Sequence, residues 1–179
     1  MGFARYEFQL VLLRRMADFQ PELVAAAREQ VGATHARYLA AHNRWQTLLH
    51  SRRAPAGLDL YRAVLGPPED VRDRPWGDLV VAAHTWPLAG LWPDLRWEVL
   101  AGAGGGVLNG WLVRAAGAPV PELPTLDRLA PWSCVVGDVA ARVPEVRVGD
   151  PDAPHRWRLD APGYRLVFVH GLLQLTQVD

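Results

Sequence analysis

The sequence contains no lysine and no isoleucine, and Cys134 is its only cysteine. Without lysine there can be no Schiff-base enzyme, no pyridoxal-phosphate site of the usual kind and no phosphate-loop lysine. A single cysteine excludes intrachain disulfides, multi-cysteine zinc sites and iron–sulfur clusters. Composition alone therefore removes several large classes of enzyme.

Long apolar segments are missing as well. No run approaches the roughly 20 residues of a membrane-spanning helix, and the apolar stretch at residues 10–13 is too short for a signal peptide. We therefore expect a cytoplasmic protein with no membrane contact. The 179 residues predict a single domain, with a helical lobe over about residues 1–66 and a β-rich lobe over about residues 77–179.

The most regular pattern predicts one long amphipathic helix over Glu22–His50. Its apolar residues recur at heptad spacing and form a seam of Val24, Ala27, Val31, Tyr38, Ala41, Trp45 and Leu48. Pro21 suits the first helical position, and the helix should end before Pro55 and Gly57. We expect this seam to pack on a sheet or to join a second copy, giving a homo-oligomer through this helix.

The other segments predict an α+β fold, in which the long N-terminal helix packs on a mostly antiparallel sheet from the second half. Residues 5–15 fit a helix slightly better than a strand, residues 59–65 fit a short helix, and residues 69–76 read as a charged surface connection. Strands are expected at 78–86, 96–99, 107–114, 132–136, 146–148, 156–159 and 164–178. The last of these should be one central strand with a bulge at Gly171.

Charge is balanced overall but unevenly distributed. Residues 1–66 carry nine arginines against five acidic residues, and the remainder carries ten against fourteen. The two halves could pack together, or Arg28, Arg37 and Arg44 could meet an anionic partner. A surplus of about four charges is small for phosphate-dominated binding, so we do not expect nucleic acid as the partner.

Arg37 and His42 have the Arg-x4-His spacing that also occurs in a large group of helical ribonucleases. The match consists of two residues, and the β-rich second half departs from that all-helical architecture. No family assignment follows from it.

A basic cluster near the C-terminus is the best candidate for binding an anionic small molecule. Arg156 and Arg158 alternate around Trp157 in a predicted strand, and Arg165 follows in the next segment. Three guanidinium groups on one face could hold a carboxylate or phosphate. The alternative is a solvated sheet face.

Four residues could carry acid–base or nucleophilic chemistry. Cys134 would be the nucleophile, His155 or His170 the base and Asp138 the group that orients it. The alternatives are an inert buried cysteine and a hydrogen-bonded core histidine.

Metal and cofactor motifs are incomplete. Asp150, Asp152 and His155 form the densest group of metal-type ligands, but this segment lacks the glycine and the terminal glutamate of a calcium loop. The glycines at residues 102–106 do not have the spacing of a dinucleotide-binding loop. We expect no resident metal and no cofactor.

Eight tryptophans are many for this length, and Trp76, Trp86, Trp92 and Trp97 lie within 22 residues of each other. Together with the helix seam they supply more apolar surface than catalytic machinery. This favours a non-enzymatic binding or assembly protein that self-associates. The alternative is an enzyme that acts on an anionic small molecule, with the three C-terminal arginines as anchors and His170 or His155 as base.

Overall fold

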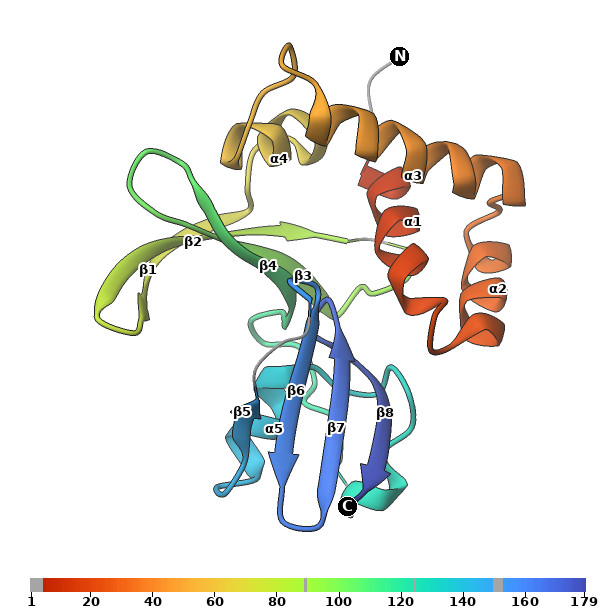
Figure 1. Ribbon diagram of the computed structural model, residues 1–179, viewed down its shortest axis with the longest axis vertical. Coiled ribbons are helices and arrows are strands. Elements are labelled where there is room, and N and C mark those ends of the chain that lie inside the picture. Colours follow the sequence, from red (N-terminus) through yellow and green to blue (C-terminus); the bar gives the residue numbers. More distant parts are fainter. Residues whose placement is uncertain (1–4, 89, 124, 150–152) are drawn as a thin grey trace.

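The computed structural model describes residues 5–88, 90–123, 125–149 and 153–179. This part of the chain has an α+β fold with five α-helices and two four-stranded antiparallel sheets (Figure 1). The helices are α1 (Arg5–Met16), α2 (Pro21–Gln30), α3 (His35–His50), α4 (Leu58–Leu65) and α5 (Val136–Arg142), with a short 3-10 helix at Leu126–Arg128.

Each sheet is built from four strands that are consecutive in the sequence. The first contains β1 (Asp70–Trp76), β2 (Leu79–Pro87), β3 (Leu95–Ala101) and β4 (Val107–Arg114). The second contains β5 (Arg147–Gly149), β6 (Arg156–Ala161), β7 (Tyr164–Val169) and β8 (Leu172–Val178). β1 and β4 are therefore the two edges of the first sheet.

Helix α1 is the centre of the larger hydrophobic core. Figure 1 shows α3 passing across one end of the molecule with α1 next to it. Phe8 of α1 contacts Trp45 of α3 and Trp97 of β3, with ring centroids 5.2 Å apart in both pairs. One aromatic side chain thus joins the helices to the first sheet.

The predicted helix over Glu22–His50 is two helices, α2 and α3. Gly32 has φ of +63°, a left-handed conformation that commonly ends a helix. Thr34 then starts α3, because its side chain accepts a hydrogen bond from the N–H of Arg37 at 3.2 Å. The seam was predicted correctly at Tyr38, Ala41 and Trp45, which are buried within one copy of the chain.

Two expectations about the strands were wrong. Residues 69–76 were expected to be a surface connection, but β1 occupies most of them and pairs with β2 from Asp70↔Thr85 to Trp76↔Leu79. Residues 132–136 were expected to be a strand, but α5 begins at Val136, and the side chain of Asp138 caps it by accepting from the N–H of Val135 at 3.0 Å.

The predicted long strand over residues 164–178 is a hairpin. Strands β7 and β8 pair through Val169↔Leu172, and His170 and Gly171 form the turn between them. Gly171 therefore marks a reversal of the chain instead of a bulge in one strand.

Three hydrophobic clusters form the core of the described residues. The helices share one cluster with the face of the first sheet that carries Leu95, Trp97 and Val99. The second sheet forms another with Cys134 and Val139. Val169 and Leu172 of the second sheet also belong to the first cluster. Trp157 packs against the third, which contains Val81, Ala83, Leu100 and Trp111. Among the described helices, none combines the length and apolar character needed to cross a membrane.

Replacing Trp45 with Ala should lower the free energy of unfolding by about 3 to 5 kcal/mol, because its ring is 6% exposed and packs on Phe8. The control is Leu39→Ala on the same helix, where the side chain is 40% exposed and the loss should be under about 1 kcal/mol. Urea unfolding measures both. Equal losses would show that the seam of α3 is not part of the core.

Candidate functional site

The two sheets meet where the β7–β8 turn reaches the edge of β4. The backbone N–H of Leu112 donates to the carbonyl of His170 over 2.7 Å, and the N–H of His170 donates to the carbonyl of His155 over 2.7 Å. The N–H of Val136 donates to the carbonyl of Gly171 over 3.0 Å. This turn therefore joins β4, the segment before β6 and the start of α5.

The turn depends on the glycine that follows His170. His170 has φ of +50° and Gly171 has φ of +80°, the two positive values that a type I′ hairpin turn requires. A Cβ atom on Gly171 would lie 2.8 Å from the carbonyl oxygen of Leu112 and 3.1 Å from Cβ of Trp111. Gly171 thus provides both the left-handed conformation and the close approach to β4.

A cleft of about 480 Å³ opens beside this turn, a volume within the usual range of ligand pockets. Six aromatic side chains line it: Tyr61, Trp76, Trp97, His155, Trp157 and His170. They come from α4, β1, β3, β6, the segment before β6 and the turn. The cleft therefore exists only when the two sheets are docked.

Aromatic contacts hold these rings in place. The centroid of His170 is 5.7 Å from that of His155 and 5.7 Å from that of Trp97. The ring of Trp157 lies 4.8 Å from that of Trp111, which in turn contacts Trp76 at 5.9 Å. Rigid, flat walls of this kind can sandwich a planar group or an apolar side chain.

Three buried N–H donors border the cleft without an acceptor among the described residues. They are Nε1 of Trp97, Nδ2 of Asn109 and Nε1 of Trp157. Trp97 is 2% exposed and Asn109 is 9% exposed. A buried donor left unpaired costs about 1 to 3 kcal/mol. These donor atoms are closed to solvent in this conformation, so a ligand acceptor pairs with them only if the side chains of the cleft wall shift on binding.

The imidazole of His170 is uncharged at neutral pH. Burial, followed by the nearby His155 and Arg15, lowers the pKa of His170 to about 3. The donors of the indole and amide groups are neutral as well. A neutral acceptor such as a carbonyl oxygen suits this environment.

Among the predicted site residues, His155, Trp157 and His170 come together in the cleft, but the arginine trio does not. Arg158 and Arg165 both pair with Asp160, at 3.1 and 3.4 Å. Arg165 also lies 3.3 Å from Asp179. Arg156 instead stacks on Phe19, with its guanidinium 5.2 Å from the ring centroid. These side chains form a charge-paired sheet face and no single anion pocket.

Cys134 and Asp138 do not form a catalytic set with the histidines. Cys134 is buried in the cluster of the second sheet, and burial raises the pKa of its thiol to about 11. Asp138 accepts from Arg114 at 2.6 Å and from the N–H of Val135 at 3.0 Å. The described contacts connect neither residue to His155 or His170. A thiolate nucleophile is therefore not prepared at this position.

The proposed metal ligands Asp150 and Asp152 lie outside the described residues. Within the described ranges, no three His, Cys, Asp or Glu side chains are grouped so that they could hold a metal ion.

The helical arginines that could have met nucleic acid are engaged within the chain. Arg28 lies over the ring of Tyr38 at 5.2 Å, Arg37 lies over Tyr6 at 5.3 Å, and Arg44 pairs with Glu7 at 2.8 Å. Their spacing on α2 and α3 thus serves packing between the helices.

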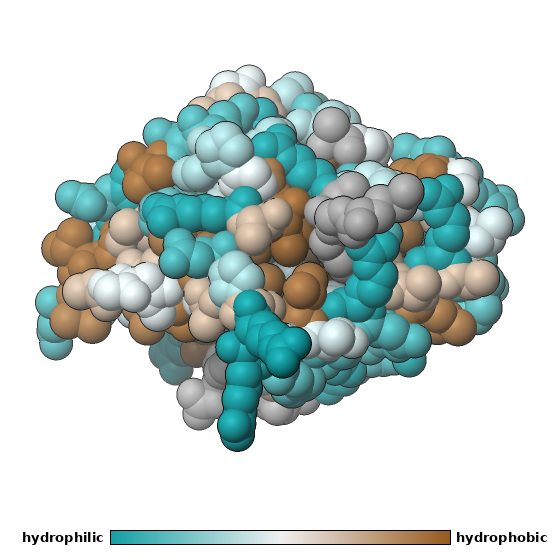
Figure 2. Space-filling view, turned by 90° about the horizontal axis from the view of Figure 1, so that it is seen from above, coloured by the Kyte–Doolittle hydropathy of each residue, from teal (hydrophilic) through white to brown (hydrophobic). Residues whose placement is uncertain are grey.

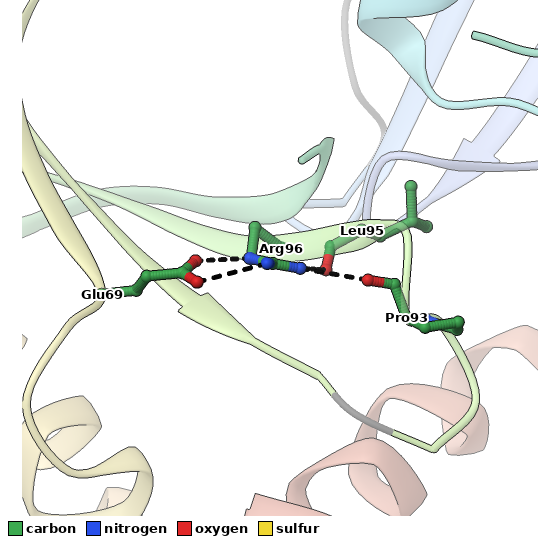
Figure 3. Close-up of polar contacts among 4 residues, drawn as sticks. All are labelled: Glu69, Pro93, Leu95 and Arg96. Carbon is green, nitrogen blue, oxygen red and sulfur yellow. Dashed lines mark hydrogen bonds and ion pairs between the residues drawn. The ribbon is translucent and has the colours of Figure 1, made fainter. Parts of the chain in front are cut away.

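A second, arginine-rich hollow lies on the face of the first sheet that points away from the helices. Arg96 forms a two-point ion pair with Glu69, with one N···O distance of 3.2 Å, and also donates to the carbonyls of Pro93 and Leu95 (Figure 3). Farther along this face, buried Glu98 accepts from Arg74 and from Trp111. These charges are neutralised within the sheet, so the hollow offers no surplus positive charge.

Tyr61 and Asn109 were not predicted as site residues. Tyr61 lies on α4, where an apolar helical face usually indicates core packing. Asn109 is the one amide side chain in the apolar strand β4. This polar residue in an apolar strand was the only feature of the sequence that could have indicated a site there.

We expect the free energy of unfolding to depend less on pH in His170→Asn than in the wild type when the pH is lowered. Because the folded pKa of His170 is about 3 and the unfolded value is near 6.5, the unfolded chain binds the extra proton between these values. The wild type should therefore lose stability as the pH falls below 6.5. At pH 5, the contribution of His170 to this loss should be as much as about 2 kcal/mol. Asn also suits the left-handed turn.

Urea unfolding at pH 7 and pH 5 measures the effect, with exposed His50→Asn as the control. The same pH dependence in wild type and His170→Asn would contradict the lowered pKa of His170.

No family model and no curated protein matches this chain. A solved structure with limited similarity is that of a proposed β-lactamase inhibitor protein from Streptococcus mutans, at 10% sequence identity and a TM-score of 0.30. The similarity covers 73% of this chain and 86% of that one. At this level it assigns neither a fold nor a function.

Proposed function

We propose that this chain is a non-enzymatic binding protein whose ligand is another polypeptide, bound in the aromatic cleft between the two sheets. The observation that carries the proposal is the set of unpaired buried donors at Trp97, Asn109 and Trp157. A polypeptide supplies carbonyl acceptors at every residue and apolar side chains for the aromatic walls.

The surface around the cleft supports a protein ligand. Leu79 and Val80, at the start of β2, are exposed, and so is Leu108 on the cleft wall. Figure 2 shows hydrophobic atoms on the left, the side to which the strands of the first sheet extend in Figure 1, as well as in the centre and on the right. Apolar surface beside a hollow is typical of protein interfaces.

The enzyme alternative has less support. Its anchors, Arg158 and Arg165, are paired with acidic side chains of the same sheet. Its base, His170, has its pKa lowered to about 3, far from the value near the working pH that acid–base catalysis favours.

Self-association through the α2–α3 helices is not part of the proposal. The apolar seam that suggested it is covered by α1 within one copy, since Tyr38, Ala41 and Trp45 are buried there.

The proposal predicts that binding and stability respond differently to removal of a cleft donor. Binding partners can be selected from a display library of protein fragments encoded by the source genome. These fragments should bind the variants Asn109→Leu and Trp157→Phe about tenfold more weakly than the wild type, because each change removes an N–H donor. Asn109→Leu should retain or gain stability, since an unpaired buried donor is removed.

The matched control is Trp132→Phe, which removes an indole N–H that is already paired with Gln174 and does not line the cleft. Titration calorimetry measures affinity and urea unfolding measures stability. Binders unaffected by both cleft variants would show that the interface lies elsewhere.

A further inference from the structure

The two edges of the first sheet are built differently. β1 carries Asp70, Arg72, Asp73 and Arg74, followed by Pro75, which has no backbone N–H. Charges and proline are the usual means of preventing another strand from pairing with an edge. β4 has neither charge nor proline from Val107 to Val113. One edge is thus protected and the other is open.

The open edge borders the cleft at Gly110. The N–H of Leu112 points away from β3, because it donates to the carbonyl of His170 at 2.7 Å. Backbone groups two residues apart in a strand point to the same side. The N–H and carbonyl of Gly110 therefore also face away from β3, and Gly110 lines the cleft.

Side-chain donors lie close to this edge. A Cβ on Gly110 would be 2.7 Å from Cζ2 of Trp97 and 3.4 Å from Cε2, the carbon that bears the unpaired Nε1–H. Asn109, with its unpaired Nδ2, is the neighbouring residue in β4. Trp97 thus packs on one face of β4 beside Gly110, whereas Asn109 points to the opposite face, so the two side chains lie on either side of the edge.

We propose that the ligand binds as an extended segment that adds a strand to β4, pairing with the backbone of Gly110. This inference rests on the proposed function and specifies its partner as an unstructured apolar segment of another protein. Among biological polymers, an extended peptide presents alternating N–H and carbonyl groups at the spacing of a strand edge. Its backbone would pair with the N–H and carbonyl of Gly110, and its alternate side chains would enter the aromatic cleft. The turn at His170 limits the added strand at one end.

The test uses a synthetic linear peptide copied from a genome-encoded binder and a series of derivatives, each with one backbone nitrogen methylated. Methylation blocks strand pairing only at residues whose N–H faces β4. The affinity for wild-type protein, measured by fluorescence anisotropy, should therefore fall about tenfold or more at every second residue and little at those between.

Protein variants test the same edge independently. Leu108→Lys places a charge on β4 and should weaken binding about tenfold or more, whereas Val71→Lys on protected β1 should leave it unchanged. The two side chains are matched in exposure, at 49% and 51%. Because methylation changes only the peptide, it gives a result even if Leu108→Lys fails to fold.

Two results would overturn the strand inference: affinity without the alternating methylation pattern, or a linear peptide that does not bind although the displayed fragment does. If Asn109→Leu still weakens binding of the displayed fragment, the proposed function survives either result. Binding that is insensitive to methylation, to Leu108→Lys and to Asn109→Leu would remove both proposals.

Discussion

The contact between the β7–β8 turn and β4 is the constraint on which the arrangement of the two sheets depends. Each sheet is a local meander, and the largest hydrophobic cluster, which joins the helices to the first sheet, also contains Val169 and Leu172 of the second sheet. The backbone hydrogen bond from Leu112 of β4 to His170 in the turn joins them, and the absence of a side chain at Gly171 allows the approach. The lack of a side chain at Gly171 thus allows the second sheet to pack against the first.

Docking of the sheets also explains why the cleft has unpaired polar groups. Its walls come from both sheets and from α4, so no single element can satisfy the N–H groups of Trp97 and Trp157. Leaving such donors buried lowers stability. Polar groups that lower stability without serving the fold commonly occur at functional sites, where a ligand completes the pairing. The open edge of β4 lies beside them.

The sequence allowed the fold class, the buried seam and most strands to be predicted, because hydrophobic periodicity reports burial directly. It did not show the interruption at Gly32 and Thr34, since a heptad pattern can continue across two helices packed on the same core. The sequence indicated His155, Trp157 and His170 as separate candidate site residues. Their convergence with Trp97 depends on the docking of the two sheets, which local periodicity does not encode.

The most direct test compares Gly171→Ala with Gly163→Ala. Both glycines lie in hairpin turns of the second sheet, with φ of +80° and +76°, but only Gly171 has no space for a Cβ, while Gly163 has no atom within 4 Å of that position. Each substitution should cost about 1 to 2 kcal/mol for the left-handed conformation, and Gly171→Ala about 1 to 3 kcal/mol more for the clash with β4. Equal losses in urea unfolding would contradict the claim that this turn docks the two sheets.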